Sequence, residues 1–207
     1  MPDTLRKHDV LEWFEKKRLK PRVHGNGFVQ VDIDERRRLH VWGHPDIPRQ
    51  DVYHPIHDHV FGFESTVLVG RLVNVNYGKP LENNEGRFRL YQALPCKHGS
   101  ADTKLALPGP EDRTHGLRYD FTPRRTDMVQ AGETYSMERF DFHETVPVEL
   151  SITMTVKSGL TLQQNPSGLR PYVAIPVDRQ PDNHFNRGDY SRDLLMRILK
   201  EVWETRK

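Results

Sequence analysis

Cysteine is almost missing from the chain, and this limits its covalent chemistry. Cys96 is the only cysteine in 207 residues, so no disulfide can form within the chain. No apolar run reaches the roughly 20 residues that a membrane-spanning helix needs, and residues 1–17 lack the apolar core of a secretory signal. We therefore expect a protein of the reducing cytoplasm without a membrane partner.

An excess of charge of one sign is missing as well. The chain has 31 basic and 29 acidic residues, a formal net charge of +2 and a mean hydropathy of −0.76. This balance argues against a dedicated nucleic-acid-binding or membrane-surface protein. A glycine-rich phosphate loop, a GxSxG turn and a CxxC pair are absent too. The short signatures of nucleotide binding, serine hydrolysis and dithiol chemistry are therefore missing.

The apolar pattern predicts a single domain, residues 1–207, with a barrel of strands over about 28–157 between two helices. The first helix is expected over 3–20, capped by Asp3 or Thr4, and an amphipathic second helix over 190–206, capped by Ser191. The second helix either docks on the strands or mediates a homodimer. Strands are expected over 28–33, 39–43, 71–78, 87–94, 117–123 and 146–158.

Two segments between these elements read as loops. Residues 95–116 form either a lid or recognition loop or a plain surface insertion. Residues 159–189, rich in Pro, Asn, Asp and Gly, are expected to wrap the surface. The segment 146–158 is different, because it alternates apolar and polar residues as an antiparallel strand with one buried face does.

Residues 54–70, HPIHDHVFGFESTVLVG, carry the strongest functional signal. His57 and His59 are two residues apart, so in a strand their imidazoles point to the same face. A third imidazole, His143, ends the segment GETYSMERFDFH. Three imidazoles that converge on one point can bind a divalent metal ion.

The spacing of these residues resembles the two motifs of the cupins, G-x5-HxH-x3/4-E-x6-G and G-x5-PxG-x2-H-x3-N. Ten residues separate His59 from Gly70, and ten separate Gly132 from His143. The resemblance covers roughly residues 54–157 and implies a double-stranded β-helix, the jelly-roll barrel of that family. It says little about the reaction, because one fold hosts many chemistries.

The chain departs from both motifs. Phe63 stands where the first motif has its glutamate, and Glu64 comes one position later. In a regular strand Glu64 points away from the histidines, and only a β-bulge would make it a ligand. Glu138, Phe140 and Pro147 replace the Pro, Gly and Asn of the second motif.

Among cupins, the chain looks most like the three-histidine oxygenases of the cysteine-dioxygenase type. This resemblance implies His57, His59 and His143 as metal ligands, with Fe(II) as the cofactor and Zn, Mn or Ni as competitors. Without a protein carboxylate, the metal favours an anionic ligand. Dioxygen and a small anionic metabolite, a thiol among the options, are the expected partners. Arg89 is the candidate anchor for a substrate carboxylate, with Arg71 as a second, and Tyr135 is the candidate hydrogen-bond donor.

Two other classes of function remain open. A metal-dependent isomerase, epimerase or lyase would use the cation as a Lewis acid on a sugar or keto acid, with Glu64 or Glu138 as base. A non-catalytic cupin would hold a small molecule in its barrel. The sequence does not choose among the three.

Overall fold

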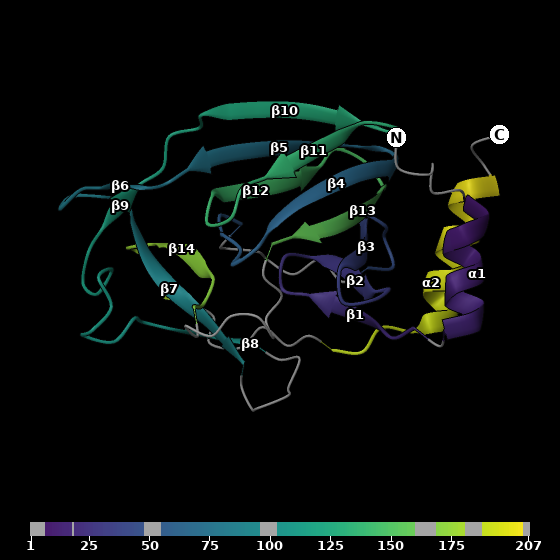
Figure 1. The fold of residues 1–207 in the computed structure, drawn as a ribbon, viewed down its shortest axis with the longest axis horizontal. Coiled ribbons are helices and arrows are strands. Elements are labelled where there is room, and N and C mark those ends of the chain that lie inside the picture. Colours follow the sequence, from purple (N-terminus) through teal and green to yellow (C-terminus); the bar gives the residue numbers. More distant parts are fainter. Residues whose placement is uncertain are drawn as a thin grey trace.

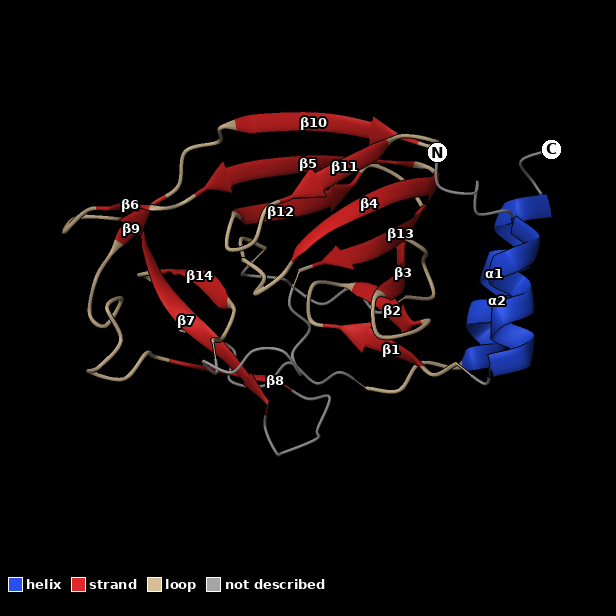
Figure 2. Ribbon diagram, viewed as in Figure 1, coloured by secondary structure: helices blue, strands red, loops and turns tan. Residues whose placement is uncertain are grey.

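The computed structural model describes residues 7–17, 19–47, 55–95, 103–159, 169–180 and 188–204. Antiparallel strands dominate this part of the chain, with one helix near each end (Figures 1 and 2). In chain order the elements are α1 (Lys7–Lys17), β1 (Pro21–His24), β2 (Phe28–Asp32), β3 (Arg37–Trp42), β4 (Gly62–Val69), β5 (Arg71–Gly78), β6 (Leu81–Glu82), β7 (Phe88–Pro95), β8 (Thr103–Ala106), β9 (Tyr119–Asp120), β10 (Arg125–Gln130), β11 (Thr134–Met137), β12 (Phe142–Pro147), β13 (Ser151–Ser158), β14 (Tyr172–Pro176) and α2 (Arg192–Glu204).

One layer is a six-stranded sheet in the order β1-β2-β3-β13-β4-β11. The two helices lie side by side against it at one end of the molecule (Figure 1). Apolar residues that alternate along the strands pack with the helices in one cluster, because side chains two apart share a face. Its fully buried members include Val10, Phe14, Val29, Val31, Leu39, Val41, Ile152, Leu195, Ile198 and Leu199.

The second layer consists of two smaller groups of strands, β10-β5-β12 and β14-β7-β9-β6, with β8 paired to β7. His57 joins these groups, because its backbone forms isolated bridges to His143 of β12 and to Val173 of β14. The sheets are open, so the described residues form an antiparallel sandwich rather than a closed barrel. The structure confirms the expected β-rich fold with a helix near each end, but it does not show the expected barrel.

Several expected elements are present with nearly the expected bounds. The strand 71–78 is β5, and the strands expected over 28–33, 39–43 and 87–94 are β2, β3 and β7. Ser191 caps α2, since the Leu194 amide donates to its hydroxyl at 3.2 Å. The helix docks on the sheet with α1. The capping residues proposed for the first helix lie outside the described residues.

Other expectations were wrong. The segment 146–158 is not one half-buried strand: β12 ends at Pro147, a bend follows, and β13 begins at Ser151. Both faces of β13 are buried from Ser151 to Thr155, because one face meets the helical layer and the other faces the second layer. The expected strand 117–123 shrinks to the two residues of β9, and the segments read as loops contain β8 and β14.

The strand expected to carry His57 and His59 also divides. β4 begins only at Gly62, and the chain bends at residues 60–61. His57 therefore belongs to the second layer through its bridges, whereas β4 belongs to the six-stranded sheet. The chain crosses from one layer to the other directly after the HxH motif, which leaves the histidines between the layers.

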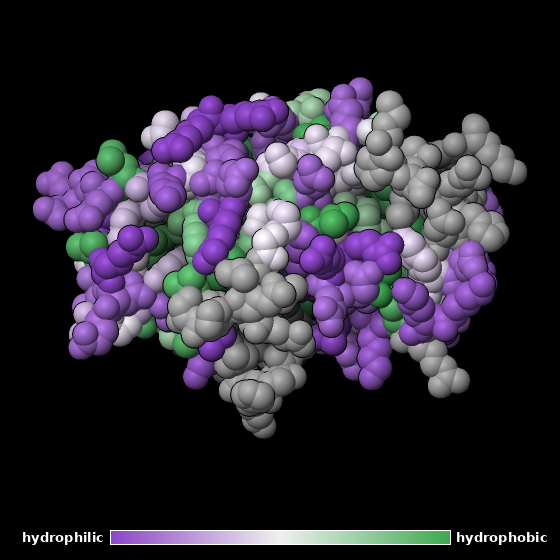
Figure 3. Space-filling view, viewed as in Figure 1, coloured by the Kyte–Doolittle hydropathy of each residue, from purple (hydrophilic) through white to green (hydrophobic). Residues whose placement is uncertain are grey.

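On the face in Figure 3, hydrophobic residues form small groups separated by hydrophilic ones. Among the described residues, neither helix has the length and apolar character needed to cross a membrane.

Candidate metal site

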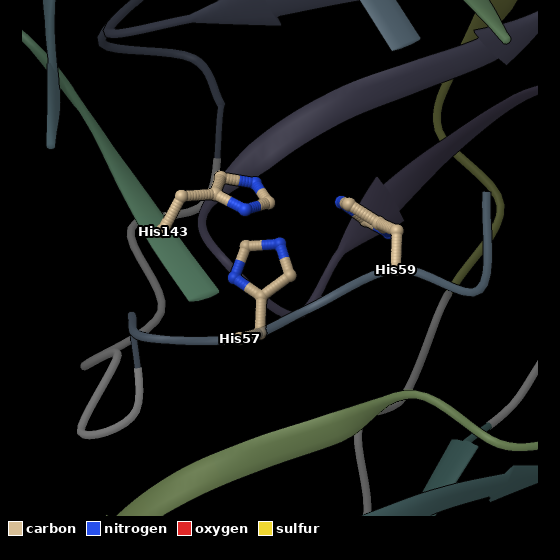
Figure 4. A group of neighbouring side chains, drawn as sticks. All are labelled: His57, His59 and His143. Carbon is tan, nitrogen blue, oxygen red and sulfur yellow. The ribbon is translucent and has the colours of Figure 1, made fainter. Parts of the chain in front are cut away.

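Three histidines meet between the two layers. The rings of His57, His59 and His143 turn toward a common space (Figure 4), and one nitrogen from each lies within 4.8 Å of the others. The ring centroids are 4.5 Å apart for His57 and His143, 4.9 Å for His57 and His59, and 5.1 Å for His59 and His143. Bonds of about 2.1 Å to one ion require the three nitrogens to lie closer together than this, so the side chains must rotate when an ion binds.

Backbone hydrogen bonds hold the HxH segment in place. The His57 amide donates to the carbonyl of His143 at 3.0 Å, and the His143 amide donates back at 2.9 Å. On the other side, the Asp58 amide donates to the Tyr172 carbonyl at 3.0 Å. The segment thus lies between β12 and β14. The His59 carbonyl also accepts from the Phe140 amide at 2.9 Å, which fixes the second histidine.

The ring hydrogen bonds leave the right nitrogens for a metal. His57 Nδ1 lies 2.8 Å from the carbonyl of Pro55, and His143 Nδ1 lies 3.3 Å from the carbonyl of Asp141. A carbonyl only accepts, so Nδ1 carries the proton in both rings and Nε2 keeps its lone pair. Metal-binding histidines are oriented in this way.

Burial keeps two of the three rings uncharged. It lowers the pKa of His59 and of His143 well below the usual histidine range, and the neighbouring His57 adds to the effect in both rings. Neutral imidazole is the form that coordinates a metal. The donor set of these three residues therefore fits a divalent ion such as Fe(II), Zn, Mn or Ni.

The histidines open into a cavity of about 60 Å³ between the layers. By volume this is room for about four water molecules or one small ligand. Aromatic and polar side chains, most of them on the six-stranded sheet, form its other walls. The lining residues are His24, Phe28, Gln30, Arg38, His40, Trp42, His57, His59, Phe61, Phe63, Tyr135, His143, Thr145 and Thr155.

Phe63 occupies the place of the missing carboxylate. Its ring centroid is 5.5 Å from those of both His59 and His143, with an edge-to-face arrangement. The side chain is 6% exposed and packs in an apolar cluster with Val60, Phe61 and Met137. A phenyl ring supplies no ligand atom, so an ion held here keeps positions for other ligands.

The cavity lining contains a permanent positive charge on Arg38, whose guanidinium also pairs with Asp32 at 2.8 Å. As far as the structure describes it, the lining contains no Asp or Glu. Arg38 and Lys157 lie 5.8 Å and 5.3 Å from the centroid of the Phe61 ring. Burial, helped by Arg38, lowers the pKa of Lys157 to about 8. These features favour an anion inside the cavity.

The other candidates from the sequence lie in different places. Tyr135 lines the cavity, and its hydroxyl has Ser65 and Thr145 as hydrogen-bond partners. Glu64 is exposed on β4 and outside the histidine cluster. Arg89 lies on β7 opposite Ile175, away from the cavity lining, and Arg71 pairs with the carboxylate of Glu149 at 3.6 Å.

Sequence reasoning missed the wall formed by β2 and β3. Gln30, Arg38, His40 and Trp42 face the cavity from positions two apart along these strands. The signal was present as polar residues that alternate with Val29, Val31, Leu39 and Val41. Such a pattern normally marks a solvated face, and a basic run such as 36–38 usually lies in water at a hairpin edge. The second layer covers this face instead.

No protein-family model matches the chain, and a search of curated proteins also found no match.

Proposed function

We propose that the chain is a mononuclear metal cupin, an Fe(II) oxygenase that acts on a small anionic metabolite. One observation carries this proposal: three imidazoles converge on one point beside a cavity whose described lining contains Arg38 and no carboxylate. Zn, Mn and Ni satisfy the same donors and are the competing metals.

Backbone conformation at the motif positions supports the family. Gly70 and Gly132 have φ angles of +78° and +91°, in the left-handed region that favours glycine. A Cβ at Gly70 would collide with the carbonyl oxygen of Leu150. Phe140 takes the place of the second motif's glycine and still has a φ of +63°. A positive φ at this position therefore supports the proposed family, although the side chain differs.

The chain's own residues would orient the substrate. Arg38 supplies a permanent positive charge for an anionic group, and its Nε is fixed by Asp32 at 2.8 Å. Phe61 and Phe63 exclude water from the histidine side of the cavity. Burial raises the pKa of Tyr135, so that its hydroxyl stays protonated and can donate to an oxygen of a ligand. Bound Fe(II) would supply the redox chemistry with dioxygen and an attachment point for the anion.

The test begins with metal content. Wild type, His143→Ala and the control His115→Ala, which removes an exposed histidine, are purified without oxygen and analysed by mass spectrometry for metals. We expect near-stoichiometric iron in wild type and in the control, and little in His143→Ala. Oxygen uptake is then measured with small anionic thiols and carboxylates. Full activity in His143→Ala would overturn the proposal.

The same measurements separate the alternatives. Zinc or manganese with turnover under strict anaerobiosis would select an isomerase, epimerase or lyase. That chemistry would lack a carboxylate base at the cavity, since Glu64 and Glu138 are both exposed. Failure to retain any metal, with tight binding of a small molecule, would select a binding module.

A further inference from the structure

Lys157 has an amino group that the fold leaves without a carboxylate partner. The residue lies near the end of β13 and is partly buried, and its Nζ donates to the main-chain carbonyl of Glu35 at 3.1 Å. None of the ion pairs formed by the described residues includes Lys157. An ammonium group has three donors. One carbonyl therefore leaves most of its hydrogen-bonding capacity unused and its charge uncompensated.

A second cation lies near Lys157. Thr155, two positions earlier on β13, is paired directly with Arg38 of β3, so the two basic side chains share one face of the sheet. Both reach the ring of Phe61, with Nζ of Lys157 5.3 Å and Cζ of Arg38 5.8 Å from its centroid. A like charge at this range disfavours the protonated form of the amine.

The nearby carboxylates are bound to other groups. Asp32 accepts a hydrogen bond from Arg38, and Asp34 accepts from Arg37. Burial, followed by the charge of Arg38, lowers the pKa of Lys157 to about 8, although both carboxylates act to raise it. At pH 7 about one amine in ten is then neutral, compared with about one in three thousand for an ordinary lysine.

A neutral, partly buried amine beside a fixed cation can act as a nucleophile. Carbon dioxide is the electrophile that suits this position. The lone pair of Nζ forms a bond to the carbon, one C–O π bond opens and leaves a negative charge on oxygen, and a proton passes from the nitrogen to water. The product is a carbamate, and no oxidant or reductant takes part. An imine formed with an aldehyde would offer Arg38 no negative charge, whereas a carbamate does.

Arg38 has donors for this product. Its side chain is 20% exposed, and its Nε is bound to Asp32 at 2.8 Å. Within the described part of the chain, its guanidinium makes no other hydrogen bond. The terminal N–H groups therefore remain for the oxygens of a carbamate, and a charge-assisted pair of this kind is stronger than a neutral hydrogen bond.

We propose that Lys157 is a site of reversible carbamate formation with carbon dioxide, and that Arg38 pairs with the carbamate. No metal takes part in the step, so the inference does not rest on the proposed function. Lys157 lies outside the described lining of the cavity, but its charge acts on His40, which belongs to that lining. Replacement of a cation by an anion at Lys157 therefore makes the potential in the cavity less positive.

The test traps the carbamate before it decomposes. The whole chain is equilibrated at pH 7 with isotopically labelled carbon dioxide and bicarbonate, and triethyloxonium then converts any carbamate into a stable ethyl ester. Peptide mass spectrometry gives the labelled fraction at each lysine, with the exposed Lys79 as the internal control. We expect about tenfold or more label at Lys157 relative to Lys79. Arg38→Gln should lower the label at Lys157 severalfold, because it removes the partner of the carbamate and the charge that disfavours the ammonium.

A second measurement needs no trapping. NMR of the labelled carbon should show a carbamate resonance that is present in wild type and in Lys79→Arg and absent in Lys157→Arg. Equal label at Lys157 and Lys79 in wild type, or the same resonances in folded Lys157→Arg as in wild type, would overturn the inference. Unchanged label at Lys157 in folded Arg38→Gln would overturn the pairing with Arg38.

Discussion

His57 and His143 exchange two backbone hydrogen bonds, with N···O distances of 3.0 Å and 2.9 Å. Two of the three candidate ligands are therefore aligned by main-chain atoms before any ion binds. Their rings reach the same space because directly paired residues of antiparallel strands point to the same face. Preorganisation of this kind reduces the cost of binding a metal, and it explains why a one-residue bridge, rather than a long strand, is enough to carry the HxH motif.

Replacement of Asp58 by Ala should loosen this arrangement. The carboxylate is 2% exposed and accepts a hydrogen bond from the Tyr172 amide at 2.6 Å, which ties β14 to the HxH segment. Asp58→Ala leaves that amide without its acceptor, so we expect a loss of about 2 kcal/mol in the free energy of unfolding. Asp58→Asn keeps an oxygen and should lose much less. Urea unfolding at pH 7 measures both, and equal losses would contradict this role.

The strand pattern could be predicted wherever one face meets the helical layer. Val29, Val31, Leu39 and Val41 alternate with polar residues and form the main core, so β2 and β3 were recognised. β13 misled the prediction, because Ser151, Thr153 and Thr155 are buried as well. Their small hydroxyls look solvated in a sequence but lie between the layers. β14 could not be predicted, since its pairing with β7 joins segments that are distant along the chain.

The sequence predicts the candidate site only where the residue type and its spacing are uncommon, as for the three histidines. Histidines at this spacing predict a candidate metal site, and the structure brings these three together. Arginines are common, so spacing alone did not distinguish Arg89 from Arg38. Only the placement of β3 against the second layer shows that Arg38 and His40 face the cavity. The expected continuous strand failed because the bend at residues 60–61 transfers the chain between layers.

Phe63→Glu should make stability depend on metal. In the metal-free protein a buried carboxylate replaces an apolar ring, which we expect to cost about 3 kcal/mol or more. A divalent ion at His59 and His143 would pair with the new carboxylate and stabilise the folded state by binding to it alone. Zinc should therefore raise the melting temperature of Phe63→Glu more than that of wild type.

The matched control for this change is Phe63→Gln, which has a similar shape without the charge. Its melting temperature should respond to zinc no more than wild type does. Thermal unfolding with and without one equivalent of zinc measures all three proteins. A zinc response that is the same for Glu and Gln would show that the side chain at this position does not reach the metal.

Phe140 has an unusual backbone conformation that single substitutions can test. Its φ of +63° is costly for a residue with a Cβ, by about 1 kcal/mol or more. Both Phe140→Gly and Phe140→Ala lose the ring that stacks with the Arg139 guanidinium at 4.4 Å. Glycine avoids the strain, so Phe140→Gly should be more stable than Phe140→Ala by about 1 kcal/mol in urea unfolding. If Phe140→Ala were more stable than Phe140→Gly, the result would contradict the positive φ at this position.

His40 should make the metal-free protein sensitive to acid. Its folded-state pKa of about 3 is below the ordinary value of 6.5, so the unfolded chain binds a proton that the folded protein refuses. Stability is therefore full above pH 6.5 and falls as the pH is lowered, by about 2 kcal/mol between pH 7 and pH 5 from this residue. The buried rings of His59 and His143 act in the same direction in every variant.

Urea unfolding with chelator at pH 7, 6 and 5 should show a smaller loss of stability for His40→Leu than for wild type. His115→Leu controls for the removal of a histidine as such, and parallel losses in wild type and His40→Leu would show that His40 takes up its proton in the folded protein.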